Sequence, residues 1–439
     1  MRQILAYYND IGTDAAKGFQ LFSICRQGVG FLVGIILAKS VLTLEDIGTY
    51  ELWLYLGLIL SLVALSGSYQ AFTATFPKLK MVDRPQAIFV VWSICWILSL
   101  VIALLIYIFK QFIFNTILNI EIIPELGKVL LFLLLHLNAA LIPYLFLVKN
   151  EAKLFFPFCI FYVLGGVASV GVPLYFGGGL PEVLHGLLLW SMIEQGLLIY
   201  LIFKFARLQV LDSYVKSFLI LLIPLSFYAG AGMLAQVFDA WLVNKTYSSF
   251  AIFAVFKYGA RELPGAVAIA SAFTASMIVV YAQGGLKSLT RIKSGSRRFM
   301  HFFFPLSILL MIFSKSLFKI VYSTEFVESA MVFNTYLLIM ISRWLFPQAL
   351  LIAMEKHRAV FRISLFELVI NIGLSLLLVP YLGLVGIALG TVIAFWAEKI
   401  LMMLQLKIRH NIAISEYVPV KIFALYSGLL LVSYLLSWI

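Results

Sequence analysis

The stretch DAWLVNKTYSSFAIFAVFKYGARELPGAVAIA, residues 239–270, places Asp239, Lys257, Arg261 and Glu262 within apolar runs. A run of about 20 apolar residues is long enough to cross a lipid bilayer as a helix. Ionisable residues inside such runs are energetically costly, and they usually face a cavity or a partner. The stretch therefore predicts membrane helices that line a functional site.

The apolar character extends over all 439 residues. Hydrophobic residues make up 63 % of the chain and charged residues 12 %, against about 45–50 % and about 25 % in soluble proteins. A folded soluble protein needs a polar surface, which this composition cannot supply. The composition excludes a cytosolic enzyme, a disordered chain and a disulfide-stapled secreted domain. It predicts an all-α polytopic membrane protein.

Cysteine and histidine give no sign of a metal or disulfide framework. The three cysteines each stand alone in an apolar run, without C-x-x-C spacing, and the five histidines are scattered. We therefore expect no zinc site and no cofactor. The N-terminus has no short apolar segment followed by a small-residue cleavage site, so the first apolar run is expected to remain as helix 1.

Thirteen apolar runs are long enough to span a membrane. A β-barrel would show short alternating strands instead. The expected helices cover residues 19–38, 47–69, 87–109, 127–148, 154–176, 181–203, 215–242, 247–283, 299–321, 327–353, 359–380, 383–408 and 418–438.

Lys and Arg residues predict the orientation of these helices, because they concentrate in cytoplasmic loops. With the N-terminus in the cytoplasm, 21 of the 32 Lys and Arg residues fall in cytoplasmic segments, which accounts for much of the net charge of +12 without a nucleic-acid partner. Five more lie within spans, and the six on the outer side are Lys39, Lys110, Lys128, Lys245, Lys315 and Lys319.

A short repeat predicts two lobes. GTYELW (residues 48–53) and KTYSSF (residues 245–250) both open an apolar run with Thr-Tyr, and they lie 197 residues apart. Six spans return the chain to its starting face, so this spacing predicts two parallel six-helix lobes around a central cavity. We expect an N-lobe over 1–210, a C-lobe over 211–410 and an extra thirteenth helix within 411–439.

Four basic residues within spans are candidate substrate contacts. Lys257 and Arg261 are spaced i, i+4, so they would share one face of a long helix over 247–283, just before a kink at Pro264. A cavity lined by Arg26, Lys257 and Arg261 would suit a phosphate or pyrophosphate group. Arg343 is a further candidate.

Each of these residues also has a purely structural interpretation. Arg26 could extend its charge to the cytoplasmic face of the membrane. Lys257 or Arg261 could be neutralised by Glu262 or Asp239. An ion pair would equally explain Arg343.

Four stretches resemble the oligosaccharidyl-lipid flippases, specifically the O-antigen (Wzx-type) branch of the superfamily that includes lipid II flippases and multidrug/toxin exporters. LAKSVLTLEDIGTYELW (37–53) is similar to the family's link between helices 1 and 2, and the stretch 239–270 to its helix 7–8 signature. VYSTEFVESA (321–330) resembles the outer turn before helix 10. NIGLSLLLVPYLGLVGIALGT (371–391) resembles helices 11 and 12.

The resemblance implies a MATE-like fold in which helices 1, 2, 7 and 8 line the cavity. It also implies a coupling-cation site formed by Asp239, Asn371, Ser375, Thr391 and the carbonyl of Ile387, whose oxygen ligands suit a hard cation. Ser375 stands where the lipid II flippases have an acid, so coupling to Na⁺ or to H⁺ is open. Simple polar contacts between helices would also explain Asn371, Ser375 and Thr391.

The function implied is a flippase, a secondary transporter and not an enzyme. It would move an undecaprenyl-pyrophosphate-linked oligosaccharide, an O-antigen or related unit of lipopolysaccharide biosynthesis, from the inner to the outer leaflet by alternating access. It would act in the bacterial cytoplasmic (inner) membrane, among membrane lipids and other polysaccharide-assembly proteins. The alternatives are a lipid II flippase and a multidrug/toxin exporter of the same fold, whose cationic substrates a basic cavity would repel.

Overall fold

A computed structural model describes residues 14–263 and 265–438. In these residues all regular structure is helical, as the composition predicts. The chain divides into two compact units. Unit 1 comprises the described residues up to Val237 together with Asn244–Ala251, and unit 2 comprises Phe238–Val243 together with the described part of Ile252–Ile439. The predicted lobe boundary near residue 210 stays a prediction.

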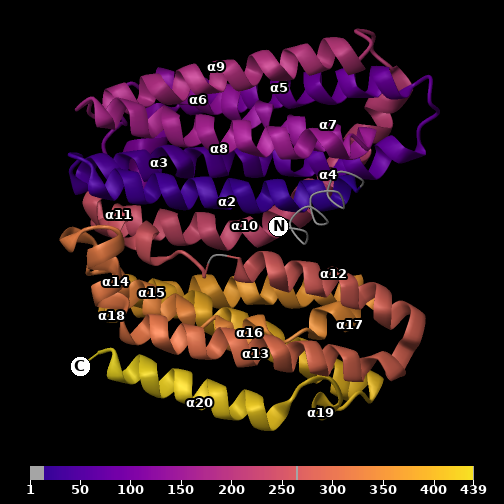
Figure 1. The fold of residues 1–439 in the computed structure, drawn as a ribbon, viewed down its shortest axis with the longest axis vertical. Coiled ribbons are helices and arrows are strands. Elements are labelled where there is room, and N and C mark those ends of the chain that lie inside the picture. The colour runs from indigo at the N-terminus through magenta and orange to yellow at the C-terminus, as the bar shows by residue number, and fades with distance from the viewer. Residues whose placement is uncertain (1–13, 264, 439) are drawn as a thin grey trace, which may run out of the picture. The chain divides into compact units, whose positions relative to one another are not determined.

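Unit 1 is a layered bundle in which long helices lie side by side (Figure 1). Helix α8 packs against both α2 and α9, and α6 packs against both α9 and α5. A capping box at Thr43, which bonds reciprocally with Asp46, fixes where α3 begins. The helices of this unit are α2 (Ala15–Lys39), α3 (Leu44–Leu60), α4 (Ser66–Thr75), α5 (Arg84–Ile108), α6 (Leu126–Ala139), α7 (Leu141–Lys149), α8 (Ala152–Tyr175), α9 (Leu180–Phe205) and most of α10 (Asp212–Tyr247).

Unit 2 contains shorter and more broken helices. Helix α13 packs against α20, while α17 packs against α12 and α18, and α15 packs against α18. Its helices are α11 (Phe250–Gly259), α12 (Ala266–Gly284), α13 (Leu289–Ile312), α14 (Ser314–Val321), α15 (Ser329–Leu337), α16 (Met340–Arg343), α17 (Pro347–Ala353), α18 (His357–His410), α19 (Ile414–Tyr417) and α20 (Val420–Leu436).

Helix α18 is a hairpin of two helices rather than one rod. Gly383 breaks it with a φ of 58°, a backbone conformation that glycine adopts without strain. Beyond the break the two halves return alongside each other, and Gly390 lies against Ser375 so closely that an added Cβ would stand 2.3 Å from the Ser375 Oγ. The predicted spans 359–380 and 383–408 correspond to these two halves.

The predicted helix over 247–283 is wrong in one respect. The chain is helical over α11 and again from α12, but residues 260–263 and 265 between them are not helical. Arg261 lies in that break, so it does not share a helix face with Lys257. The kink expected at Pro264 falls on a residue outside the described part of the chain.

Two other predicted spans are bent. The helix that ends at Ile312 turns by 77° into α14, and Ser329–Arg343 turns by 45° into α17. Among the described residues, six helices are long and apolar enough to cross a membrane, and these two bent pairs would bring the number to eight. The predicted thirteenth helix is present as α20, and whether it spans stays a prediction.

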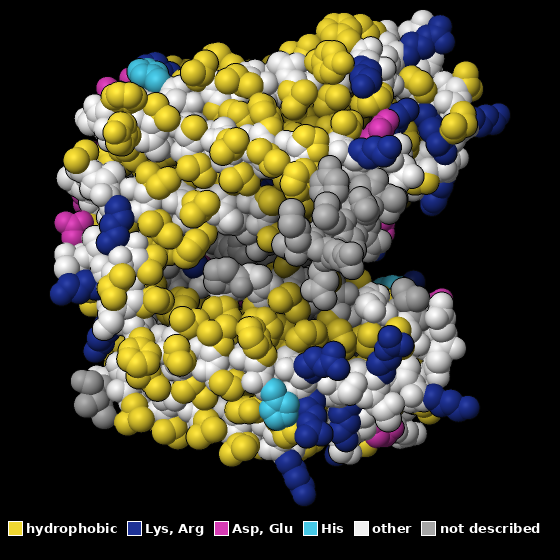
Figure 2. Space-filling model, in the orientation of Figure 1, with side chains coloured by type: hydrophobic (Ala, Val, Ile, Leu, Met, Phe, Trp, Pro, Cys, Tyr) yellow, Lys and Arg dark blue, Asp and Glu magenta, His cyan; other side chains and the backbone are white. Residues whose placement is uncertain are grey.

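The outer faces of the helices are those of a protein surrounded by lipid. On the face shown in Figure 2, large apolar side chains cover the flanks of each unit, and Lys and Arg side chains gather mainly toward the edges. Leu164 and Phe203 in unit 1 are 65 % and 68 % exposed, whereas Glu194 in the same unit is 2 % exposed. Apolar residues outside and ionisable residues inside are the arrangement that a bilayer favours.

Candidate functional site

A buried polar cluster in unit 2 gathers around Asp239, a residue of α10. Thr391 donates from its Oγ1 to the Asp239 Oδ2 over 2.7 Å, and the Tyr336 hydroxyl donates to the same oxygen over 3.3 Å. Asn371 donates from its Nδ2 to the Thr391 Oγ1 over 2.9 Å. Asp239, Asn371 and Thr391 are all buried. Helices α10, α15 and both halves of α18 therefore meet at one carboxylate.

Two oxygens in this cluster have no hydrogen-bond donor among the described residues. They are the Oδ1 of Asp239 and the Oδ1 of Asn371, and both are buried. A buried acceptor without a donor destabilises a fold by about 1–3 kcal/mol, and by more for a charged group. Such a pair of free oxygens is what a small hard cation would bind.

Ser375 and Ile387 extend the cluster by one helical turn. The Ser375 hydroxyl donates to the Ile387 carbonyl over 3.3 Å, and Thr391 also lies 3.4 Å from that carbonyl. The structure thus brings together all of the residues that the family resemblance assigns to a cation site. Carboxylate, amide, hydroxyl and carbonyl oxygens fit Na⁺ chemically. Asp239, as the single carboxylate in the cluster, could equally bind and release a proton.

Tyr336 belongs to this cluster and was not a sequence prediction, because no pattern in the span 327–353 distinguishes it. Lys257 lies near enough to the Asp239 carboxylate to interact with it electrostatically. The sequence left open whether Lys257 binds substrate or compensates an acid. Its proximity to Asp239 favours a part in the charge balance of the cluster.

The other two predicted basic contacts of unit 2 lie by the break after α11. The Arg261 guanidinium stands over the Tyr258 ring, 4.3 Å from its centroid. Arg343 forms an ion pair with Glu262, and both side chains are about one-fifth exposed. The sequence did not decide whether Arg343 forms an ion pair or contacts substrate, and the structure contains the ion pair, with Glu262.

Unit 1 has a different cluster, centred on Glu194 of α9. The His136 ring of α6 bonds through its Nδ1 to the Glu194 Oε2 over 2.6 Å, and Glu194 is 2 % exposed. His136 stacks on Phe132, with ring centroids 5.5 Å apart. The sequence treated His136 as one of five scattered histidines. Its place in the apolar run FLLLHLNAA was the available signal, because an ionisable residue in a span usually has a partner.

Arg26 of α2 lies beside this pair. It is close enough to interact electrostatically with His136 and with a group of tyrosines, yet its own side chain is exposed. In the described part of the chain, no carboxylate oxygen stands within 4.0 Å of its guanidinium. The tyrosines of the group are Tyr69, Tyr144 and Tyr162.

Two of these tyrosines pack against each other beside Arg26. Tyr69 stacks on Tyr144 with centroids 4.7 Å apart, and its hydroxyl donates to the Leu137 carbonyl over 2.8 Å. Aromatic rings beside an arginine can hold a flat apolar or sugar surface next to an anion. Arg26 is thus an exposed cation that has no acidic partner in the described part of the chain.

Comparison with known proteins shows the fold. The chain matches no family model and no curated protein sequence. It resembles the solved structure of the lipid II flippase MurJ in an inward closed conformation, with a TM-score of 0.65 at 15 % identity, over 95 % of this chain and 97 % of that one.

Two further solved structures have the same architecture. An inward-facing multidrug resistance MATE family transporter of the MOP superfamily gives a TM-score of 0.63 at 15 % identity, over 87 % of this chain and 94 % of that one. A MOP superfamily transporter from Pyrococcus furiosus gives 0.57 at 16 % identity, over 91 % and 97 %. The chain is therefore an all-helical polytopic membrane protein with the MurJ and MATE fold, which confirms the predicted fold class.

Proposed function

We propose that this protein is a flippase for an undecaprenyl-pyrophosphate-linked oligosaccharide, an O-antigen or related repeat unit. It carries the lipid from the inner to the outer leaflet of a bacterial cytoplasmic membrane by alternating access, together with other proteins of polysaccharide assembly. One observation carries the proposal: Arg26 in unit 1 is exposed, lacks an acidic partner among the described residues and stands beside tyrosines.

The His136–Glu194 pair supports this role for Arg26. Glu194 is bonded to His136, and among the described residues its carboxylate forms no ion pair with the Arg26 guanidinium. Arg26 would bind an anion from outside the protein, because a guanidinium forms paired hydrogen bonds with phosphate oxygens. Lys257 and Arg261 of unit 2 stay predicted substrate contacts.

The Asp239 cluster supports coupling to a cation. A buried carboxylate with one free oxygen takes up Na⁺ or H⁺ readily, because the ion neutralises a charge that burial disfavours. Thr391 and Asn371 come from the two halves of α18, so ion binding at Asp239 would pull α10 and α18 together. Release of the ion would loosen that contact, as alternating access requires.

Two other functions use the same fold. A lipid II flippase also carries a pyrophosphate, so Arg26 would serve it equally, and only the glycan distinguishes the two. The exposed Arg26 disfavours a multidrug exporter of cationic compounds, because like charges repel.

The test is genetic. Deleting the gene should abolish surface polysaccharide and cause its lipid-linked unit to accumulate, and the intact gene should restore both. Arg26→Ala should fail to restore them, whereas Arg26→Lys should restore them in part, because it keeps the charge without the paired hydrogen bonds. Arg298→Ala, at another exposed arginine, is the matched control. Full restoration by Arg26→Ala would contradict the proposal.

A further inference from the structure

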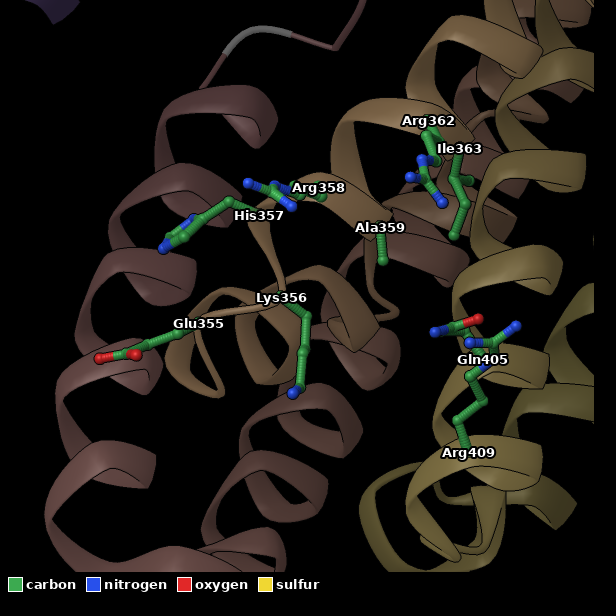
Figure 3. A pocket seen from close by; sticks show the side chains of 9 residues that line it. All are labelled: Glu355, Lys356, His357, Arg358, Ala359, Arg362, Ile363, Gln405 and Arg409. Carbon is green, nitrogen blue, oxygen red and sulfur yellow. The ribbon is translucent and has the colours of Figure 1, made fainter.

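The open end of the α18 hairpin contains a basic pocket that the transport site does not use. A turn after α17 leads into the first residues of α18, and Glu355 in that turn has a φ of 59°. The last turns of α18 face the first ones, with Gln405 and Arg409 on the returning half (Figure 3). The cavity has a volume of about 560 Å³, which lies within the usual size range of small-molecule sites.

The lining of this pocket is strongly cationic. Four of its side chains are Lys or Arg and one is a carboxylate, which gives a net charge of +3 with His357 neutral. Within the described residues, no carboxylate oxygen stands within 4.0 Å of any of the four cations. In the close-up the Glu355 carboxylate points away from Arg362 and Arg409 (Figure 3). The four cations are Lys356, Arg358, Arg362 and Arg409.

The backbone adds to this positive field. Helix α18 begins at His357, on the wall of the pocket, and a helix N-terminus carries a partial positive charge. Arginines that extend from successive turns of one helix and from a facing helix can surround the oxygens of a phosphoryl group. The chemistry that matches this pocket is an anion with several phosphate oxygens.

Apolar residues at the border of the pocket indicate that the anion belongs to a lipid. Phe361 and Leu365 occupy helix positions next to the lining arginines and are 47 % and 52 % exposed. Leu404 and Ile408 flank Gln405 and Arg409 in the same way and are 41 % and 73 % exposed. The charged pocket thus lies where the exposed apolar flank of α18 meets its polar end, an arrangement that suits a lipid headgroup.

This pocket is separate from the Asp239 cluster. Arg358 lies about 20 Å from Asn371 along the axis of α18, at a rise of about 1.5 Å per residue. The charge pattern of the sequence assigns this end of unit 2 to the cytoplasm.

We propose that the pocket formed by Lys356, Arg358, Arg362 and Arg409 binds the phosphate or pyrophosphate headgroup of a membrane lipid in the inner leaflet. The lipid is either an anionic phospholipid or the polyprenyl pyrophosphate of the transported substrate, and only the second source rests on the proposed function. In that case the pocket is a docking site that the headgroup occupies before transport.

The experiment measures lipid binding to the purified full-length protein by native mass spectrometry in detergent. The probes are phosphatidylglycerol, undecaprenyl pyrophosphate, phosphatidylcholine and inorganic pyrophosphate. The wild type should bind at least one of the two anionic lipids about tenfold more tightly than phosphatidylcholine. A preference for undecaprenyl pyrophosphate identifies the docking site, and equal or stronger binding of phosphatidylglycerol identifies a general anionic-lipid site.

Substitutions of the pocket arginines test whether the lipid binds in this pocket. Arg362→Gln with Arg409→Gln should remove the preference for anionic lipids, and Arg362→Lys with Arg409→Lys should keep part of it. Lys407→Gln with Arg298→Gln is the matched control, because Lys407 is exposed on α18 but points about 200° around the helix from Arg409. The control should bind like the wild type.

Unchanged binding by the double glutamine variant would overturn the proposal, and so would inorganic pyrophosphate that binds as tightly as the lipids. Thermal unfolding of each variant checks that the fold is intact, which is expected because both arginines are exposed. This binding assay is independent of transport. Its failure would leave the Arg26 test of the proposed function unaffected.

Discussion

Each unit has a buried carboxylate at the centre of its polar cluster, Glu194 in unit 1 and Asp239 in unit 2, and the two are satisfied differently. In unit 1, Glu194 of α9 is held by the ring of His136. In unit 2, Asp239 receives neutral hydroxyls from Thr391 and Tyr336, and its Oδ1 has no donor among the residues that the structure describes. The first acid is compensated by the chain itself. The second lies near Lys257 but lacks a donor to one oxygen among the described residues, as expected of a site that binds and releases an ion.

The spacing of the two Thr-Tyr motifs in the sequence also relates Glu194 to the Asp239 cluster. Glu194 and Thr391 are 197 residues apart, the same spacing that separates Thr49 from Thr246 in the two Thr-Tyr motifs. The repeat that this spacing predicts would make Glu194 and Thr391 equivalent positions, an acid in unit 1 and the hydroxyl that bonds to an acid in unit 2. This difference accords with the proposal that unit 1 binds the substrate anion and unit 2 the coupling ion.

The largest effect is expected at Asp239. Asp239→Asn keeps the size of the side chain and an oxygen for Thr391, but it removes the charge. A hydrogen bond to a charged group contributes about 1.5–3 kcal/mol, so affinity for the coupling ion should fall about 10- to 100-fold. Transport in proteoliposomes with an imposed Na⁺ or H⁺ gradient measures this. Asp212→Asn, at an exposed position of the same helix, is the control. Undiminished gradient dependence in Asp239→Asn would rule out a coupling role.

The next effect concerns the unit 1 pair. His136→Leu leaves Glu194 buried without its partner, and the loss should lower the free energy of unfolding by about 2–3 kcal/mol. That figure is at the low end for a buried pair because the His136 side chain is 30 % exposed. Thermal unfolding in detergent measures it. The double variant His136→Leu with Glu194→Gln should recover part of the stability, since no charge is left unpaired. Additive losses would show that the two residues do not interact.

A smaller effect is expected from the close approach within α18. Gly390→Ala places a Cβ against the Ser375 hydroxyl and backbone, and such overpacking destabilises by about 1–2 kcal/mol. Gly373→Ala on the same helix meets nothing within 4 Å and should be neutral or slightly stabilising. Equal melting temperatures for the two variants would mean that the α18 halves can separate freely at Ser375.

The smallest effect distinguishes the two roles of Arg343. Glu262→Gln breaks a partly exposed ion pair, which should lower stability by about 1 kcal/mol or less. If Arg343 also binds substrate, Arg343→Ala will reduce transport far more than Glu262→Gln does. Similar transport in both variants would leave only the structural role.

The fold was predictable because a bilayer imposes strict lengths and polarities on its helices. The span near 19–38 coincides with α2, and the break between 380 and 383 coincides with Gly383. The break after Gly259 was missed because residues 260–265 are flanked by apolar runs on both sides, and hydropathy does not distinguish a helix from an irregular segment between helices. Backbone conformation there depends on packing that a single sequence does not contain.

The site was only partly predictable, for a similar reason. Asp239, Asn371 and Thr391 could be grouped through the family resemblance, and the structure places them in contact. Tyr336 and His136 could not be assigned, because their roles follow from which residue of another helix lies opposite them. Arg26 was a candidate from its position in an apolar run, but its exposure beside a compensated acid is visible only in three dimensions.

The most direct test of the central claim is a flipping assay in proteoliposomes with an undecaprenyl-pyrophosphate-linked oligosaccharide. The wild type should move the lipid between leaflets. Arg26→Ala should lose at least about tenfold of that rate, as removal of a charged hydrogen-bond partner implies, and Arg26→Lys should lie between them. Flipping by Arg26→Ala at the rate of the wild type would contradict the assignment of the anion site to unit 1.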